Sequence, residues 1–169
     1  MIDLDAEAIY RTLLPRVREL VAGRDVRLVG IHTGGVWIAE RLKADLAIPH
    51  PVGSLDVSFY RDDFDTSGLS ATVKPSSIPF EVADQNLLLV DDVLYTGRTT
   101  RAALNELFDH GRPARIDLAV LIDRGGRELP IAPTVTGRTI EVPPSISVVL
   151  SRDDDLNLHL TLEQRSEDA

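Results

Sequence analysis

Cysteine is absent from the 169-residue sequence, so neither disulfide bonds nor thiolate metal sites can contribute to its structure. Long apolar runs are also absent: no stretch reaches the length that spans a bilayer, and the acidic N-terminal segment lacks the basic start of a leader. Basic residues are few, with 18 Lys and Arg against 27 Asp and Glu and a formal net charge of −9. This balance disfavours a generic nucleic-acid-binding surface but leaves room for a local basic patch. We therefore expect a cytoplasmic protein with no membrane partner.

What the sequence does contain is the composition of an ordinary globular protein. It is 43% hydrophobic and 27% charged, and its length is enough to bury a core without covalent cross-links. We expect a single domain over residues 1–169, with no linker, internal repeat or low-complexity segment.

The most informative stretch covers residues 87–100. Four consecutive aliphatic residues, Leu87 to Val90, are typical of a strand buried on both faces, as in a parallel sheet covered by helices. Asp91 and Asp92 follow at the carboxyl end of this strand. A small, hydroxyl-rich turn around Gly97 then precedes a helix predicted from about Thr99 to the residues before Gly111.

This order of strand, acid pair, turn and helix predicts a phosphosugar site. The start of a helix offers unpaired backbone N–H groups to a phosphate, and Thr96, Thr99 and Thr100 add hydroxyl donors. Carboxylates repel phosphate, so Asp91 and Asp92 should face hydroxyls or a cationic centre, as a ribose 5-phosphate would provide. The alternative is that the acid pair only ends a strand and Thr99 only caps a helix.

The same stretch resembles the signature of type I phosphoribosyltransferases, which bind 5-phosphoribosyl 1-pyrophosphate (PRPP). From Val90 to Thr99 it is similar in particular to the PyrR group, pyrimidine operon regulators that are also uracil phosphoribosyltransferases. The resemblance implies an α/β fold with a central, mostly parallel sheet flanked by helices, a small hood and a flexible loop. It also implies that Asp91 and Asp92 are catalytic and hold the ribose hydroxyls. The implied substrate-binding residues of this stretch are Val93, Leu94, Tyr95, Thr96, Gly97, Arg98, Thr99 and Thr100.

A second glycine-containing turn, His32 to Gly35, lies between a predicted strand over Val26–Ile31 and a predicted helix over Val36–Leu46. Two such turns at the carboxyl ends of parallel strands can face one ligand. The resemblance makes this the pyrophosphate loop, with Thr33 and Gly34 binding substrate, although His32 and Gly34 replace two residues that are usually basic. By itself the pair of glycines is equally well explained as a tight turn.

Residues 52–79 predict an edge strand followed by a long polar loop. Alternating residues from Val52 to Tyr60 suggest a strand with one wetter face. The loop that follows is interpreted as a lid that excludes water from reactive PRPP. Arg61, at its base, resembles the catalytic family arginine that approaches the pyrophosphate, and its alternative role is a surface ion pair with Asp62 or Asp63.

The second half of the chain extends the resemblance. A predicted strand over Ile116–Ile122 leads into a segment similar to one near the base and ribose in PyrR proteins, which makes Arg124 a substrate-binding residue; Gly126 stands where a histidine is usual. Residues 146–150 and 156–162 predict a short antiparallel pair that completes a base-binding hood. At the other end of the chain, a helix is expected over residues 5–21, with Pro15 kinking or splitting it.

The expected reaction converts uracil and PRPP to UMP and pyrophosphate. Mg²⁺ would enter with PRPP, with no dedicated metal site beyond Asp91 and Asp92. The resemblance further implies a homodimer or higher homo-oligomer that regulates pyrimidine gene expression by binding the pyr mRNA leader, with UMP or UTP as effector. Alternatives are a nucleotide sensor without transferase activity, a transferase that has lost RNA binding, and, more distantly, a purine or orotate transferase. The arginines that could form an RNA patch are Arg11, Arg16, Arg18, Arg24 and Arg27.

Overall fold

A five-stranded parallel sheet organises the chain, with strand order β2-β1-β3-β4-β5. The structure is a computed structural model that describes residues 4–57 and 76–166. Its strands are β1 (Val26–Ile31), β2 (Gly53–Leu55), β3 (Asn86–Leu94), β4 (Arg115–Asp123), β5 (Val135–Thr139), β6 (Ile146–Arg152) and β7 (Leu158–Gln164). Its helices are α1 (Ala6–Val21), α2 (Gly34–Leu46) and α4 (Arg98–Asp109).

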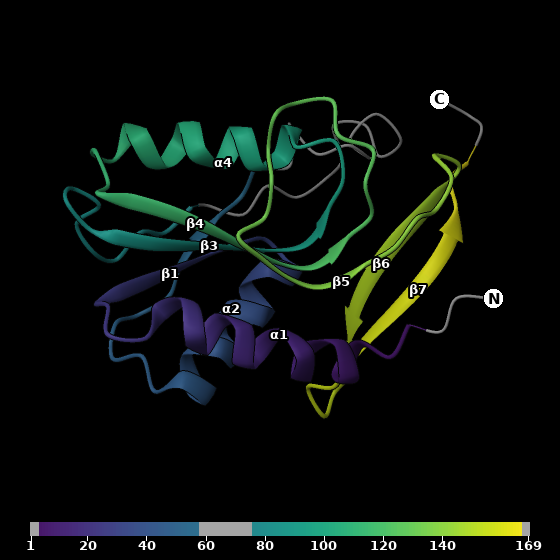
Figure 1. Cartoon of the computed structure of the whole chain (residues 1–169), viewed down its shortest axis with the longest axis horizontal. Coiled ribbons are helices and arrows are strands. Elements are labelled where there is room, and N and C mark those ends of the chain that lie inside the picture. The colour runs from purple at the N-terminus through teal and green to yellow at the C-terminus, as the bar shows by residue number, and fades with distance from the viewer. Residues whose placement is uncertain (1–3, 58–75, 167–169) are drawn as a thin grey trace.

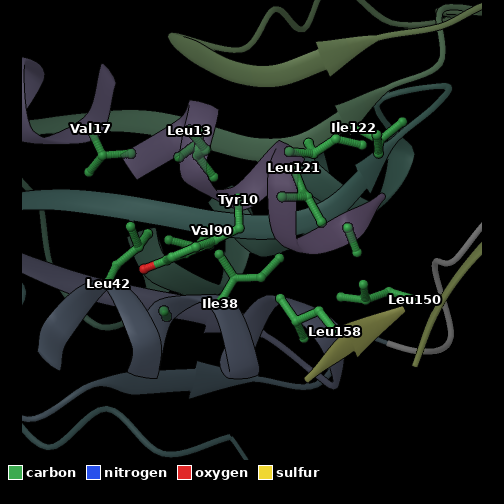
Figure 2. Packing of buried hydrophobic residues seen from close by; sticks show 14 of the residues in the cluster. Tyr10, Leu13, Val17, Ile38, Leu42, Val90, Leu121, Ile122, Leu150 and Leu158 are labelled. Carbon is green, nitrogen blue, oxygen red and sulfur yellow. The ribbon is translucent and has the colours of Figure 1, made fainter. Parts of the chain in front are cut away.

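The central strand β3 is buried on both faces, as its unbroken aliphatic run predicts. Leu87 and Leu89 belong to the apolar cluster beneath α4, whereas Leu88 and Val90 belong to the cluster beneath α1 and α2. Figure 1 shows α4 on one face of the sheet and α1 and α2 on the other. In Figure 2, Val90 lies between residues of the two helices on its face. This two-sided burial fixes the position at which β3 ends, and therefore the position of the predicted site.

Helix α1 runs without interruption through Pro15, so of the two predicted effects of this proline, a kink or a split, the split is wrong. The Asp5 side chain caps the helix by accepting a hydrogen bond from the Ala8 N–H (3.0 Å). Leu13 and Val17, on either side of Pro15, are completely buried against the sheet. Because most helical stability comes from packing of the buried face, this burial outweighs the backbone hydrogen bond that proline cannot make.

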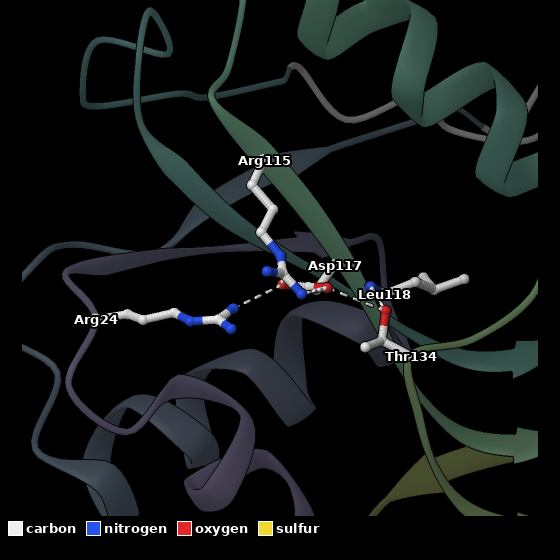
Figure 3. Close-up of polar contacts among 5 residues, drawn as sticks. All are labelled: Arg24, Arg115, Asp117, Leu118 and Thr134. Atoms are coloured by element: carbon white, nitrogen blue, oxygen red, sulfur yellow. Dashed lines mark hydrogen bonds and ion pairs between the residues drawn. The ribbon is translucent and has the colours of Figure 1, made fainter.

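Both edge strands of the sheet differ from the sequence-based expectation: one is shorter than predicted, and the other was not predicted. Strand β2 is at the predicted edge but has only three residues, and part of its predicted range lies outside the described residues. Strand β5 forms the other edge and was not predicted, because its residues are mostly polar. Figure 3 shows how the chain before β5 is held: Thr134 lies beside Asp117, and its hydroxyl accepts a hydrogen bond from the Leu118 N–H (3.0 Å).

The predicted antiparallel pair is present as a β6–β7 hairpin, which together with Arg165 we call the hood. Leu150 and Leu158 from the two strands join the apolar cluster beneath α1 and α2 (Figure 2), so the hood is packed onto the same core as the sheet. Figure 1 shows the hood beside the carboxyl ends of β3 and β4. Within the described segments, no helix has both the length and the apolar character needed to cross a membrane.

Candidate active site

A cavity of about 190 Å³ lies between the carboxyl ends of β1 and β3 and the hood. It is the place where an open parallel sheet normally binds ligands. Seven of the residues predicted from the sequence line this cavity: Thr33, Gly34, Asp91, Asp92, Val93, Tyr95 and Arg124, and an eighth, Thr99, joins them from α4. The predicted hood strand supplies Ser147, Val148, Val149 and Leu150. Residues that the sequence did not indicate complete the wall, namely Ile31, Trp37 and Arg165.

The two carboxylates stand within β3 and not after it, because the strand continues to Leu94. The Asp91 side chain is buried, and its Oδ1 accepts a hydrogen bond from the Asp92 N–H (2.8 Å). Oδ1 of Asp92 in turn accepts one from the Val93 N–H (2.8 Å). These local bonds hold both carboxylates in defined positions on the floor of the cavity, as recognition of a sugar diol requires.

The start of α2 is pressed against the same carboxylates. The helix begins at Gly34, two residues earlier than predicted, and Thr33 is its N-cap without a side-chain capping bond. A Cβ at Gly34 would lie only 2.5 Å from Oδ2 of Asp92, and a Cβ at Gly35 would overlap the carbonyl oxygen of Val90. The two glycines are therefore explained by the close approach of α2 to β3, which brings the N–H groups at the helix start beside Asp92.

The start of α4 forms the second helix terminus near the cavity. Gly97 is its N-cap at φ +95°, a conformation that favours glycine, and the helix begins at Arg98, one residue before the predicted start. Oγ1 of Thr96 accepts a hydrogen bond from the Arg98 N–H (3.2 Å). The Thr100 hydroxyl is buried and has no hydrogen-bond partner among the described residues. This terminus has the donors expected of a phosphate site.

Six predicted residues are not among the described residues that line the cavity. Thr96, Gly97 and Thr100 lie at the start of α4, and the other three are Leu94, Arg98 and Arg61. Leu94 is buried in the apolar cluster beneath α4. Arg98 is exposed and pairs with Glu128 across 3.3 Å. Arg61 and the polar loop interpreted as a lid lie outside the described residues, except for the loop's last few positions.

The segment after β4 is tied to the signature stretch by one side chain. Arg127 donates hydrogen bonds to the carbonyl oxygens of Tyr95 (2.8 Å) and Ile131 (2.8 Å) and to Oδ2 of Asp123 (2.7 Å). Gly126 lies at φ +78°, and a Cβ there would overlap the Tyr95 ring. There is consequently no room for a side chain at this position while the Tyr95 ring occupies its present place.

Arg124 is more a support of the hood than a free substrate ligand. Its side chain is buried, and its guanidinium lies over the Tyr95 ring with 3.9 Å to the centroid. Its terminal nitrogens donate to the carbonyl oxygens of Ile146 (2.6 Å) and Pro143 (3.1 Å) at the base of the hood. Arg165, from the end of β7, lies over the same ring at 5.1 Å. No motif marks Arg165, because its place in the cavity depends only on how the hood packs.

A charged contact fastens the hood to the helices behind it. Glu7 of α1 pairs with Arg41 of α2 through two hydrogen bonds (2.9 and 2.7 Å), and it accepts a third from the Leu158 N–H of β7 (2.7 Å). The bond to Arg41 lowers the pKa of Glu7, and the Glu7 carboxylate raises the pKa of Arg41. Burial, with the Asp45 carboxylate, raises the pKa of the Tyr10 hydroxyl nearby. The pair is thus a fixed ionic joint between α1, α2 and the hood.

Asp91 and Asp92 are the carboxylates that line the cavity among the described residues. Among residues 4–57 and 76–166 no group of three or more His, Cys, Asp or Glu side chains is arranged to hold a metal ion. Asp91 and Asp92 nevertheless offer the carboxylate oxygens that Mg²⁺ prefers, and a substrate carrying phosphates would add the remaining ligands. The donor set therefore fits a magnesium ion that enters with its substrate.

Comparison with known proteins identifies close relatives of the chain. Residues 4–152 match the family described as phosphoribosyl transferase domain. The chain is 46% identical over 164 residues to the bifunctional protein PyrR of Nitrosococcus oceani, an alignment that covers 94% of this chain and 93% of that protein. It is 56% identical over 137 residues to the bifunctional protein PyrR of Pseudomonas aeruginosa, covering 77% and 81% of the two chains.

Solved structures agree on the fold. A hypoxanthine-guanine phosphoribosyltransferase from Bacillus anthracis superposes with a TM-score of 0.66 at 18% identity, covering 86% of this chain and 85% of that chain. A hypoxanthine phosphoribosyltransferase from Staphylococcus aureus gives 0.65 at 20% identity, covering 83% and 77%. At these identities the likeness shows the fold alone, and it confirms the predicted central parallel sheet with flanking helices.

Proposed function

The chain belongs to the phosphoribosyltransferase family and, within it, to the PyrR group, and on that premise we propose that it converts uracil and PRPP to UMP and pyrophosphate. The observation that carries this proposal is the position of Asp91 and Asp92 between the starts of two helices, α2 and α4. Helix starts bind anions, and carboxylates bind sugar hydroxyls. A ligand with a diol between two phosphate groups, as PRPP has, matches this arrangement.

Each part of PRPP is assigned to one part of the cavity. The 5′-phosphate binds at the start of α4, where Thr96, Thr99 and Thr100 supply hydroxyls and backbone N–H groups. The pyrophosphate binds at the start of α2, beside Thr33 and Gly34. The ribose lies over Asp91 and Asp92, and the base lies beneath the hood.

The residues act mainly by placing charge. As the bond from the ribose C1′ to pyrophosphate breaks, the leaving group takes the electron pair and positive charge develops on the sugar, which Asp91 and Asp92 stabilise. The C1′–N1 bond to uracil then forms, and N1 releases its proton. Mg²⁺ would be held mainly by PRPP oxygens, with Asp91 and Asp92 as the protein carboxylates, and it would neutralise charge on the leaving pyrophosphate. Arg61 has the same predicted role.

The test is a steady-state assay of pyrophosphate release from PRPP and Mg²⁺ with uracil, orotate, cytosine, hypoxanthine and adenine in parallel. We expect release that depends on uracil. Asp91→Asn and Asp92→Asn should fold normally and lose most turnover, because the shape is kept while the charge facing the transition state is removed. Asp109→Asn, at the far end of α4, is the matched control. Near-normal turnover in the two signature variants would contradict the assignment.

A second function, binding of the pyr mRNA leader with UMP or UTP as effector, is supported by the word bifunctional in the relatives' names. The N-terminal arginines give it less support. Arg16 donates to the Thr136 carbonyl oxygen (2.6 Å), Arg24 pairs with Asp117 (3.5 Å), and Arg27 donates to Gln85 (2.6 Å). A gel shift with leader RNA at increasing salt tests it, because real phosphate contacts weaken steeply with salt. A chain that binds UMP tightly but releases no pyrophosphate would instead be a sensor.

Four further assignments stay predictions. They are a single phosphoribosyltransferase domain over residues 1–169, a homodimer or higher homo-oligomer, a cytoplasmic location, and the lid role of the loop after Arg61. Sedimentation with and without UMP would test the oligomer directly.

A further inference from the structure

We propose that Arg165 determines base specificity by donating a hydrogen bond to a carbonyl oxygen of the pyrimidine. This inference rests on the proposed function, because it takes the hood to be the base-binding side of the cavity. It names the residue that reads the base, which neither the signature stretch nor the segment after β4 provides.

The first step is that Arg165 is held at the cavity wall. Its backbone N–H donates to the carbonyl oxygen of Ser145 (2.8 Å), and its Nε donates to Oγ of Ser147 (3.1 Å). Its guanidinium lies over the Tyr95 ring, 5.1 Å from the centroid. Both Tyr95 and Ser147 also line the cavity, so the guanidinium is fixed among cavity residues by contacts on two sides.

The second step is that Arg165 has donors left to use. Only its Nε makes a side-chain hydrogen bond to the described residues, so the terminal nitrogens Nη1 and Nη2 remain available. Arg124 differs, since each of its terminal nitrogens already donates one hydrogen bond, to the carbonyl oxygen of Ile146 or of Pro143, and these bonds hold it against the hood. Of the two arginines over Tyr95, Arg124 is therefore a positioning residue and Arg165 is the one that presents N–H groups to a ligand.

The hydrogen-bonding groups of the base determine whether it can pair with the Arg165 guanidinium. A guanidinium only donates hydrogen bonds, so it pairs with a carbonyl oxygen and is mismatched with an exocyclic amino group. Uracil carries two carbonyl oxygens and no amino group. The remaining hood residues at the cavity are mainly apolar, Val148 and Leu150 among them, and suit the face of a planar ring. The wall around Arg165 thus favours a dione base.

The experiment compares Arg165→Gln with Arg152→Gln. Arg152 is the matched control, since it is also a hood arginine over an aromatic ring, that of Trp37 (4.9 Å), but it does not line the cavity. We expect R165Q to raise the uracil KM by roughly tenfold to a hundredfold, the usual effect of losing one charged hydrogen bond. The PRPP KM should change by less than about twofold, and R152Q should raise the uracil KM much less than R165Q does.

Equilibrium binding separates the base from the phosphosugar. UMP and ribose 5-phosphate differ only in the base, so R165Q should weaken UMP binding by a similar factor and leave ribose 5-phosphate unchanged. Equal weakening of both ligands would assign Arg165 to a phosphate and overturn the proposal, as would identical effects of R165Q and R152Q. If R165Q does not fold, Arg165→Lys, which keeps the cation and loses the donor fork, carries the same comparison.

Failure of the proposed function is recognised separately. A wild-type protein that releases no pyrophosphate with uracil would refute the transferase assignment. The binding comparison of UMP with ribose 5-phosphate needs no turnover, and it still decides whether Arg165 reads the base.

Discussion

Alanine substitutions at the neighbouring residues Gly125 and Gly126 would measure the effect of a steric contact with Tyr95 separately from the effect of backbone strain. Both lie at positive φ, +70° and +78°, so an alanine at either position incurs similar backbone strain of roughly 1–2 kcal/mol. They differ in space: a Cβ at Gly125 meets nothing within 4 Å, whereas a Cβ at Gly126 overlaps the Tyr95 ring. The Tyr95 ring has little freedom to give way, because Arg124 lies over it at 3.9 Å.

Overpacking of a fixed side chain costs about 1–3 kcal/mol. Gly126→Ala should therefore be less stable than Gly125→Ala by about that amount, as measured by urea unfolding at a single protein concentration. Only Gly126→Ala should raise the uracil KM, because only it displaces Tyr95 from the cavity wall. Equal loss of stability in the two variants would refute the argument that Tyr95 occupies the space that a side chain at position 126 would need.

The other predictions concern the joints on either side of the cavity. Glu7→Gln should cost about 1–2 kcal/mol at pH 7. The pKa of Glu7 is lowered in the folded state, so the Glu7–Arg41 pair stabilises the fold above the ordinary glutamate pKa, and this contribution is lost as the pH falls. The melting temperature of E7Q should therefore depend less on pH between 3 and 6 than that of the wild type. The control is Glu19→Gln, an exposed position on α1, whose melting temperature should follow the wild type. Gly34→Ala should weaken PRPP binding at least roughly tenfold with a smaller loss of stability, because its Cβ meets the Asp92 side chain. Gly35→Ala should instead mainly reduce stability, because its Cβ meets the backbone of Val90; the reverse pattern in PRPP titrations and melting curves would contradict the close-approach explanation.

Features set by local pattern were predicted correctly. The aliphatic run before Asp91 identified a strand buried on both faces, and alternating leucines identified β7. The start of α2 was misplaced because Gly34 and Gly35 have the composition of a turn, and only the proximity of β3 explains them as helical. Strand β5 was missed for a related reason: its five residues gain their strand conformation from pairing with β4, not from hydrophobic alternation.

Contacts between residues that are far apart in the chain could not be predicted from the sequence. Arg124 lines the cavity, but its bonds to the carbonyl oxygens of Pro143 and Ile146 span 19 and 22 positions of the chain and depend on how the hood packs. Arg165 follows the last strand and belongs to no motif. Glu7 has the appearance of an ordinary first-turn acid, and its contact with Leu158 spans 151 positions of the chain. Such contacts follow from tertiary packing, which a local pattern does not encode.

The absence of a side chain at Gly34 affects how the site accommodates the charge of pyrophosphate. The space that a side chain at Gly34 would need is taken by Asp92, so a carboxylate is in close contact with the start of α2. The start of a helix stabilises a nearby negative charge by roughly 0.3–1 kcal/mol, and here the Asp92 carboxylate already receives part of this stabilisation. An entering pyrophosphate must therefore rely on backbone N–H groups, on the magnesium that accompanies it, and on cations from elsewhere in the chain. The net charge of −9 is compatible with such a substrate because the local donors, and not the overall balance, determine whether the anion binds.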